Sequence, residues 1–329
     1  MSAAEPTVSV ILVSWNTRGL LDACLRSLRP EVEDINGEVW VVDNNSADGS
    51  PDMVAAGHPW VHLIRNDTNA GFARACNLVF PQLQSRYVFL FNPDAVLDSG
   101  ALKILSAAMA SHPEMAAMCP RMLDRNGQPT HFAGRASRLS AARLRIERSL
   151  IWKLSKFAPI RAHWERAART YLSHSPTTGV YPRNHVEGAA LFVRLDALRS
   201  AGWFDPSFFC GWEETDLTIR LRSMGWQVGV CADAAIRHWD QQSRLQWKTR
   251  HWEIADSYYF ARKHGGTYGL LRHAARERRL MKKRWAAGED RSRSLAEHKR
   301  VLQCLLKSPE HPGYDWWDPN GAESPQSRS

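Results

Sequence analysis

An uninterrupted apolar run, Tyr87–Phe91, constrains the fold more than any other stretch of the sequence. Five such residues without a charge are typical of a strand that is buried on both faces of a parallel sheet. The run ends in Asn92, Pro93 and Asp94, and a proline cannot continue the hydrogen-bond ladder of a strand. We therefore expect Asn92 and Asp94 at the carboxyl edge of the sheet, where ligands bind in open α/β folds. Taken alone, the same three residues are also ordinary turn chemistry.

Further apolar runs alternate with helical patterns, which indicates an α/β protein with a mostly parallel sheet and right-handed crossovers. We expect additional strands at residues 8–13, 39–42, 61–64, 116–119, 185–194 and 226–230. Helices are expected after Thr17, from Gly71, at 100–111, around 195–201, from Glu213, and at 247–264. The first helix should end near Pro30, where its apolar pattern fades, and the last at Gly265–Gly266.

Composition limits the class of protein. The chain has 329 residues, of which 44% are hydrophobic and 23% charged, values that are ordinary for a globular protein with a large core. We find no apolar run near the ~20 residues needed to cross a bilayer and no signal-peptide pattern, so we expect a cytoplasmic protein. The six cysteines form no C-x-x-C pair, which favours buried thiols over disulfides or zinc ligands.

The net charge of +9 is concentrated near the end of the chain, at Arg272, Arg276, Arg278, Arg279, Lys282, Lys283, Arg284, Arg291 and Arg293. Localised positive charge suits phospholipid headgroups, a lipid diphosphate or nucleic acid, although a solvated helix face explains it as well. Nucleic acid is the weakest of these partners, because the chain lacks the aromatic-basic motif of any known reader.

Two regions differ from the alternating pattern. Residues 134–184 contain many Arg and several Trp residues without strand alternation, and we expect a helical or mobile insertion there. From Gly269 onward, apolar residues interleave with Arg and Lys, as on a helix that lies at an anionic membrane surface. Packing on the preceding domain and a homodimer contact are the alternatives. We therefore divide the chain into a catalytic domain, 1–268, and a basic helical extension, 269–329, with a disordered tail from Glu310.

Polar residues follow two further expected strands. Ser14 and Asn16 come after the first strand, and Asp43 and Asn45 after the second. Small polar residues at such places are ordinary helix caps, but these side chains can also read a nucleotide base and ribose. Gly71 would permit a close backbone approach to a ligand at the amino terminus of the helix that follows.

Three acids in four positions, Glu213, Glu214 and Asp216, open a later helix. Acidic residues in a first turn favour the helix macrodipole, so they need no function to be present there. Three of them exceed what capping alone requires.

The chain resembles the family 2 glycosyltransferases, and among them the bacterial rhamnosyltransferase-like branch, in an ordered set of motifs. These are VSVILVSWN, VVDNNSADGS, RNDTNAGFARACN, LFNPDA, EGAALFVR, GWFDPSFF, GWEETDLTIRLRSMGW and IRHWDQQSR, which extend from Val8 to Arg244. Each motif is weak alone, whereas the ordered set is specific. The resemblance implies a GT-A fold, which binds a nucleotide-diphosphate sugar, and an inverting transfer of the sugar to an acceptor hydroxyl.

The resemblance also implies roles for individual residues. The substrate-binding set is Ser14, Asn16, Asp43, Asn45, Asn69, Gly71, Asn77, Asn92, Trp212 and Glu213, with Asp43 at the base. Asn92 and Asp94 occupy the place of the DxD metal motif, so Asp94 is expected to bind Mg²⁺ or Mn²⁺ that bridges two phosphates. Asn92 departs from DxD, although NPD is usual in this branch. His238 matches a histidine that completes the metal shell in some relatives; an ordinary surface or core histidine is the alternative.

Glu213 and Glu214 match the family's Glu-Asp pair, whose second member is the general base, and Glu214 departs from that pattern by one methylene. The implied function is inverting transfer of a rhamnose-like sugar from a dTDP- or UDP-linked donor. The acceptor would be a lipid-linked or surface glycan, such as O-antigen or capsule, made at the cytoplasmic side with peripheral contact to the plasma membrane. The alternative is a nucleotide-sugar-binding protein without catalysis, against which the acid pair and Asp94 argue.

Overall fold

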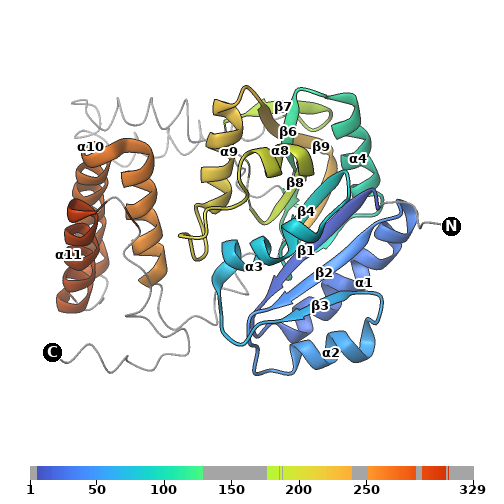
Figure 1. The fold of residues 1–329 in the computed structure, drawn as a ribbon, viewed down its shortest axis with the longest axis horizontal. Coiled ribbons are helices and arrows are strands. Elements are labelled where there is room, and N and C mark those ends of the chain that lie inside the picture. Colours follow the sequence, from blue (N-terminus) through green and yellow to red (C-terminus); the bar gives the residue numbers. More distant parts are fainter. Residues whose placement is uncertain are drawn as a thin grey trace.

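The computed structural model describes residues 6–128, 176–184, 186, 188–238, 251–286, 291–308 and 310. The described strands form one nine-stranded sheet in the order β3-β2-β1-β4-β8-β6-β9-β5, with β7 paired to β9 (Figure 1). The predicted α/β architecture is confirmed. The expected disordered tail, apart from Glu310, and residues 134–175 of the expected insertion lie outside the described residues.

One half of the sheet is parallel and consists of β1 (Val8–Ser14), β2 (Glu38–Asp43), β3 (His62–Arg65) and β4 (Tyr87–Phe91). The helices between them are α1 (Arg18–Asp34), α2 (Ser50–Gly57) and α3 (Gly71–Val79), and a 3₁₀ turn, η1 (Phe80–Gln82), precedes β4. Every residue of β4 is buried, as its unbroken apolar run predicts. The register places Ser14 beside Asp43, so the residues after β1, β2 and β4 reach the same sheet edge.

The other half of the sheet contains β6 (Met115–Leu123) and β9 (Gln227–His238), which run in the same direction as β1 to β4. The strands of opposite direction are β8 (Ala190–Arg194), between β4 and β6, and β5 (Ala95–Leu97) and β7 (Val180–Arg183), both paired with β9. The sequence predicted neither β5 nor β7. We expected no strand within residues 134–184, so β7, which pairs with β9, corrects the description of the insertion.

Helix α1 continues through Pro30 to Asp34, whereas we expected it to end at the proline. Packing explains the difference, because Glu31 and Val32 in its last turns are buried. The Glu31 carboxylate accepts hydrogen bonds from the backbone nitrogens of Gly100 (2.6 Å) and Leu102 (3.2 Å). These are unsatisfied donors at the start of α4 (Ala101–Ser111), so tertiary contacts outweigh the hydrogen bond that the proline removes.

Two buried clusters cover the two faces of the sheet. Residues of α1, α2 and α4 pack on one face, together with Val10, Leu12 and Phe89. The other face contacts α3, α8 (Leu195–Ser200) and α9 (Glu213–Ser223), and its cluster extends to Leu270 and Leu305 near the end of the chain. None of the six cysteines, all of which lie in described residues, forms a disulfide, as expected.

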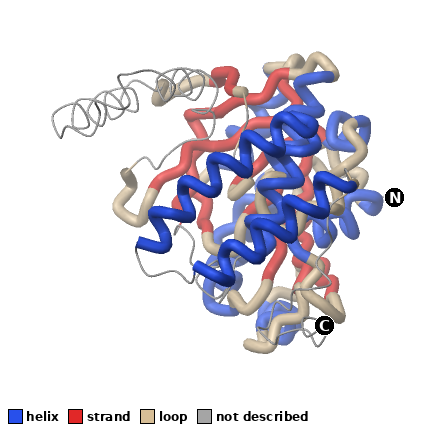
Figure 2. Tube along the Cα trace, turned by 90° about the vertical axis from the view of Figure 1, so that its left-hand side faces the viewer, coloured by secondary structure: helices blue, strands red, loops and turns tan. Residues whose placement is uncertain are grey.

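The last helices are α10 (His251–Ala286) and α11 (Arg291–Lys307). Gly266 interrupts α10 with φ 59° and ψ −157°, where we expected a helix end, and divides it into a first arm, 251–265, and a second arm, 267–286. Gly269 fits closely, since a Cβ there would lie 2.6 Å from Ala261 O. The Tyr258 hydroxyl lies 2.8 Å from His298 Nδ1, which joins the first arm to α11. The two helices α10 and α11 run side by side (Figure 2). No helix in the described ranges is long and apolar enough to span a bilayer.

Candidate active site

The loops that follow β1 and β2 are locked together at the carboxyl edge of the sheet. Asn16 and Asn45 both have positive φ, 53° and 63°, a conformation that asparagine tolerates better than most residues. The Asn16 nitrogen donates to Ser46 Oγ (2.8 Å), and the Ala47 nitrogen donates to Asn16 Oδ1 (2.8 Å). The Ser46 nitrogen also donates to Asp43 Oδ2 (2.8 Å). The structure therefore brings Asn16, Asp43 and Asn45 together.

Ser14 belongs to the same edge. Its carbonyl accepts a hydrogen bond from the Asn44 nitrogen (2.8 Å), and its hydroxyl lies 2.9 Å from Thr17 Oγ1. Asn44 was not among the predicted residues, yet its buried amide donates to Gly71 O (3.1 Å) and accepts from Asn66 Nδ2 (2.8 Å). It thus joins the end of β2 to the start of α3. The sequence signal that could have identified Asn44 is its place in the polar run Asp43–Asn45 at the end of β2.

Two buried polar atoms here have no hydrogen-bond partner among the described residues: Asp43 Oδ1 and Asn69 Nδ2. The first is an acceptor and the second a donor, and Asn69 is fixed by its Oδ1, which accepts from the Gly71 nitrogen (3.0 Å). Leaving such groups buried and unsatisfied costs on the order of 1–3 kcal/mol each. Both are therefore suited to hydrogen-bond a ligand.

The start of α3 is packed against a distant segment of the chain. Gly71 has φ 79°, and a Cβ on it would lie 2.4 Å from Phe209 O. The Phe72 nitrogen donates to the same oxygen (2.6 Å). The close approach that Gly71 permits in the structure is therefore to Phe209, whereas we expected an approach to a ligand.

Asn77 lies near the other end of α3. Its Nδ2 donates to Phe204 O (2.9 Å), and its Oδ1 accepts from the Phe204 nitrogen (3.2 Å). Both ends of the amide thus join α3 to the backbone that precedes α9. Asn77, which we expected among the substrate-binding residues, therefore lies near the end of α3 and contacts the protein backbone in this structure.

The turn after β4 brings the two expected metal ligands together. Asp94 is 1% exposed, and its Oδ1 lies 3.0 Å from His238 Nε2. The strand pairing explains the contact, because β5 follows Asp94 directly and its first residue, Ala95, aligns with His238 at the end of β9. The sequence implied this meeting only through the family resemblance, since β5 was not predicted.

The donor set of this pair fits a divalent cation that is completed by a ligand. The described residues contain no cluster of three or more His, Cys, Asp or Glu side chains that could hold a metal. A carboxylate and an imidazole supply two protein ligands, and Mg²⁺ is commonly held by one or two carboxylates together with substrate phosphates. Mn²⁺ likewise suits carboxylate and water oxygens, so Asp94 is the stronger ligand of the pair. Asp94 and His238 therefore suit a metal–diphosphate complex better than a metal alone.

The acid pair begins α9. Glu213 is buried, and its Oε2 accepts a hydrogen bond from the Gly211 nitrogen (2.5 Å). Burial, and then the charge of Glu214, raise the pKa of Glu213 well above its usual range. The Trp212 ring packs on Phe260 of α10, with ring centroids 4.6 Å apart. The structure thus places Trp212 between α9 and α10.

A short segment at residues 188–189 contacts both the acid pair and the turn after β4. A Cβ on Gly188 would lie 3.2 Å from Glu214 Cγ and 3.3 Å from Glu214 Cδ. The next carbonyl, of Ala189, accepts a hydrogen bond from the Asn92 nitrogen (3.0 Å). Glu214 and the backbone of Asn92, remote in the chain, therefore contact adjacent residues of one short segment.

Comparison with known sequences gives a family and similar proteins. Residues 9–163 match the family model described as Glycosyl transferase family 2. The chain is 26% identical over 312 residues to an N-acetylglucosaminyl-diphospho-decaprenol L-rhamnosyltransferase of Mycobacterium tuberculosis, which covers 91% of this chain and 94% of the relative. It is 26% identical over 223 residues to a beta-monoglucosyldiacylglycerol synthase of Synechocystis sp., where 63% of this chain and 40% of the relative are covered.

Solved structures show the same fold. The structure of GalNAc-T7 with UDP, GalNAc and Mn²⁺ is similar to this chain, with a TM-score of 0.51 and 12% sequence identity. The match covers 78% of this chain and 51% of the GalNAc-T7 chain. The mannosyltransferase PcManGT from Pyrobaculum calidifontis, in complex with GDP-Man and Mn²⁺, has a TM-score of 0.50 and 17% identity, with 93% and 82% of the two chains covered. The expected GT-A fold, with helices after the sheet domain, is confirmed.

The packing of Phe209 on α3 predicts that Gly71→Ala destabilises the protein far more than Gly100→Ala. Both glycines have φ 79°, but a Cβ on Gly100 has nothing within 4 Å. Gly100→Ala should cost about 1–2 kcal/mol for the left-handed backbone alone. Gly71→Ala should cost roughly 3 kcal/mol or more, since Phe209 must also move. Urea unfolding of the two variants measures the difference, and equal losses would contradict the packing.

Proposed function

We propose that the chain, whose residues 9–163 match the family 2 glycosyltransferase model, transfers a sugar from a nucleotide-diphosphate donor to an acceptor hydroxyl, with inversion at the anomeric carbon. The observation that supports this most is that Glu214 and the backbone of Asn92 contact the adjacent residues 188 and 189. A carboxylate suited to a cation and a carboxylate suited to a base then share one sheet edge. Inverting transfer needs the base on the side of the reacting carbon opposite the departing diphosphate.

Ser14, Asn16, Asp43, Asn45 and Asn69 would bind the nucleotide. The unpaired Asp43 Oδ1 supports a donor whose base carries a ring N–H, as uracil and thymine do. This agrees with a UDP- or dTDP-linked sugar. The rhamnosyltransferase named among the relatives supports a rhamnose-like sugar.

Asp94 and His238 would hold Mg²⁺ or Mn²⁺, and the Asn92 side chain would lie beside them. When bound, the cation supplies charge neutralisation for the diphosphate leaving group. The two structural neighbours with Mn²⁺ support this assignment. The protein's own contribution is to keep the buried Asp94 carboxylate beside His238, whose Nε2 would exchange its contact with Asp94 Oδ1 for the cation.

Glu214 is the residue that we propose as the general base, with Glu213 as its partner. The raised pKa of Glu213 favours a proton on that carboxyl group, and a neutral Glu213 leaves the negative charge of the pair on Glu214. Contact with Gly188 holds the Glu214 side chain beside the turn that carries Asp94. A base placed there can accept the proton of an acceptor hydroxyl that enters the same edge.

The acceptor that we propose is lipid-linked, because the relatives are named for a decaprenol diphosphate and a diacylglycerol. The exposed side chains described on the second arm of α10 and on α11 include no acid. The basic ones are Arg272, Arg276, Arg278, Arg279, Lys299, Arg300 and Lys307. Tyr268 (74% exposed) and Leu271 lie among them. Such a surface suits anionic lipid headgroups at the cytoplasmic face of a membrane.

Glu214→Gln should reduce transfer by about 10²- to 10⁴-fold, the usual worth of a general base. Binding of the nucleotide sugar should persist, because Gln keeps the size of the side chain and the nucleotide pocket is separate. Product formation and donor affinity are measured on the same preparation, with a panel of UDP- and dTDP-sugars.

Glu33→Gln, the same change on the exposed side of α1, is the matched control. Full turnover by Glu214→Gln would remove the proposed base. If the unmodified protein binds donors but neither transfers nor hydrolyses them, the non-catalytic binding protein becomes the better description.

Asp94→Asn should weaken the Mn²⁺-dependent part of UDP binding by roughly tenfold or more, because the amide keeps the shape but loses the charge that attracts the cation. Calorimetric titration with UDP, with and without Mn²⁺, measures this part directly. Asp34→Asn, at an exposed carboxylate paired with Lys103, is the control and should change nothing. The same gain in affinity from Mn²⁺ in wild type and Asp94→Asn would refute the ligand role.

Reversing three exposed charges, Arg272→Glu, Arg276→Glu and Arg279→Glu, should abolish co-sedimentation with phosphatidylglycerol vesicles. Vesicles of phosphatidylcholine should bind neither the wild type nor this triple variant, since these vesicles carry no net charge. The control reverses three exposed charges elsewhere, at Arg26, Arg29 and Lys103. Equal sedimentation of both triple variants would reject this membrane surface.

A further inference from the structure

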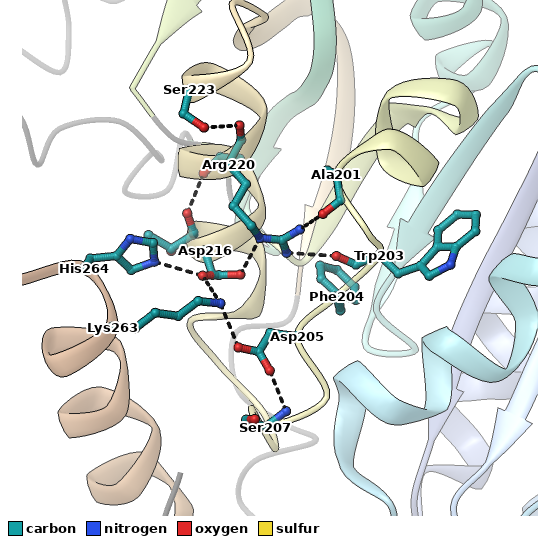
Figure 3. A network of polar contacts seen from close by, with 12 residues as sticks. Ala201, Trp203, Phe204, Asp205, Ser207, Asp216, Arg220, Ser223, Lys263 and His264 are labelled. Carbon is teal, nitrogen blue, oxygen red and sulfur yellow. Dashed lines mark hydrogen bonds and ion pairs between the residues drawn. The ribbon is translucent and has the colours of Figure 1, made fainter. Parts of the chain in front are cut away.

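An ionic network of partly exposed cations around a buried carboxylate joins α9 to the first arm of α10 (Figure 3). Its centre is Asp216, whose side chain is 0% exposed. This carboxylate accepts hydrogen bonds from Arg220 Nε (2.8 Å), Lys263 Nζ (2.7 Å) and His264 Nε2 (2.8 Å). Asp216 lies two residues after Glu214, in the first turn of the same helix. The sequence shows Asp216 and, four residues later, Arg220 in the same helix, but it carries no signal for Lys263 and His264, which come from a helix far along the chain.

Lys263 also binds the other end of the segment that carries the acid pair. Its Nζ lies 2.7 Å from Asp205 Oδ2, which also accepts from the Tyr259 hydroxyl (2.9 Å). The other Asp205 oxygen accepts from the Ser207 nitrogen (2.9 Å). One ammonium group therefore bridges the carboxylates at both ends of residues 205–216.

The middle of this segment is anchored by the same helix arm. Asp256, which is buried, accepts hydrogen bonds from the Phe209 and Cys210 nitrogens, each at 3.1 Å. Trp252 Nε1 donates to Cys210 O (3.0 Å). Phe209 O in turn accepts from Phe72, at the start of α3. The segment is thus held between α3 and α10, and Gly211, Trp212 and the acid pair follow directly.

The charges of the network are complementary. Burial raises the pKa of Asp216, but hydrogen bonds from His264 and Lys263, and the charge of Arg220, lower it more, to about 2. The pKa of Asp205 is lowered in the same way, chiefly by Lys263 against the effect of burial. The Nη1 and Nη2 atoms of Arg220 donate hydrogen bonds to the carbonyls of Ala201 and Trp203, respectively. Lys263 is therefore the cation that neutralises the Asp205 end of the segment.

We propose that Lys263 and His264 are positioning residues for the transfer reaction. By binding Asp216 they fix the first turn of α9, and so the place of the Glu214 carboxylate beside Gly188; this inference rests on the proposed role of Glu214. They touch neither donor nor acceptor in this assignment. Their removal should lower the rate of the chemical step, because a small displacement of a base away from its proton is costly, whereas the nucleotide pocket keeps its shape.

The test is Lys263→Met, which removes the charge but keeps most of the side-chain length. We expect kcat to fall about 10- to 100-fold while the KM for the donor stays within about twofold of wild type. Lys263→Arg, which restores the cation, should recover most of the rate. The matched control is Lys103→Met on α4, an exposed lysine that pairs with Asp34 outside the network and outside the proposed binding surfaces, which should leave kcat unchanged. Thermal unfolding and UDP binding are followed for every variant.

Full kcat in Lys263→Met, with Glu214→Gln inactive, would overturn the positioning role and leave the proposed function intact. An active Glu214→Gln would instead remove the proposed base itself. Loss of donor binding together with kcat, without recovery in Lys263→Arg, would mean a general structural role and would also overturn the proposal. If Lys263→Met does not fold, His264→Ala and His264→Gln replace it. Gln can still donate to Asp216, so it should retain more of kcat than Ala; equal rates would count against the proposal.

Discussion

The arrangement of the site depends on residues 205–212 being pressed against the start of α3. Phe209 supplies the contact, through the hydrogen bond from the Phe72 nitrogen to its carbonyl, and the absence of a side chain at Gly71 makes room for it. A left-handed glycine at the beginning of a helix is otherwise ordinary, as Gly100 shows. Here the backbone of another segment fills the space, so the position of the acid pair is tied to α3, which follows the proposed nucleotide pocket.

From this contact, a continuous path leads across the site. Asn66 and Asn44 join the end of β2 to Gly71 by side-chain hydrogen bonds, and Phe209 continues the path to Asp256 on α10. On the other side, Ala189 joins the Asn92 backbone to the loop against which Glu214 rests. All of these bonds except the one between Asn66 and Asn44 have at least one backbone partner. They fix loops more firmly than pairs of exposed side chains do, because one partner has little conformational entropy to lose.

The sequence predicted the parts that depend on local patterns. The buried strands follow from runs such as Tyr87–Phe91, and the polar residues at the sheet edge follow from where these runs stop. Prediction from the sequence failed where contacts between residues distant in the chain determine a helix end or the partner of a side chain. Pro30 lies inside α1 because Glu31 and Val32 are buried by other elements, and Asn77 bonds to Phe204 because the segment before α9 passes beside it. Lys263 and His264 could not be found either, since their partner lies 47 and 48 residues earlier and neither residue sits in a motif.

Side chains on both sides of residue 268, the expected boundary between a catalytic domain and an extension, pack in one buried cluster. Leu270 and Leu305 belong to the same buried cluster as Leu217 of α9 and Val42 of β2, so the second arm of α10 and α11 complete the core on that face of the sheet. The first arm of α10, which holds the Asp216 network, is itself supported by these helices through Tyr258 and His298. The basic side chains of the second arm of α10 and of α11 therefore lie on helices that support the acid pair indirectly, through the first arm of α10. A partner that shifted those helices would act on Glu214 through Lys263 and Asp216, without touching the nucleotide pocket.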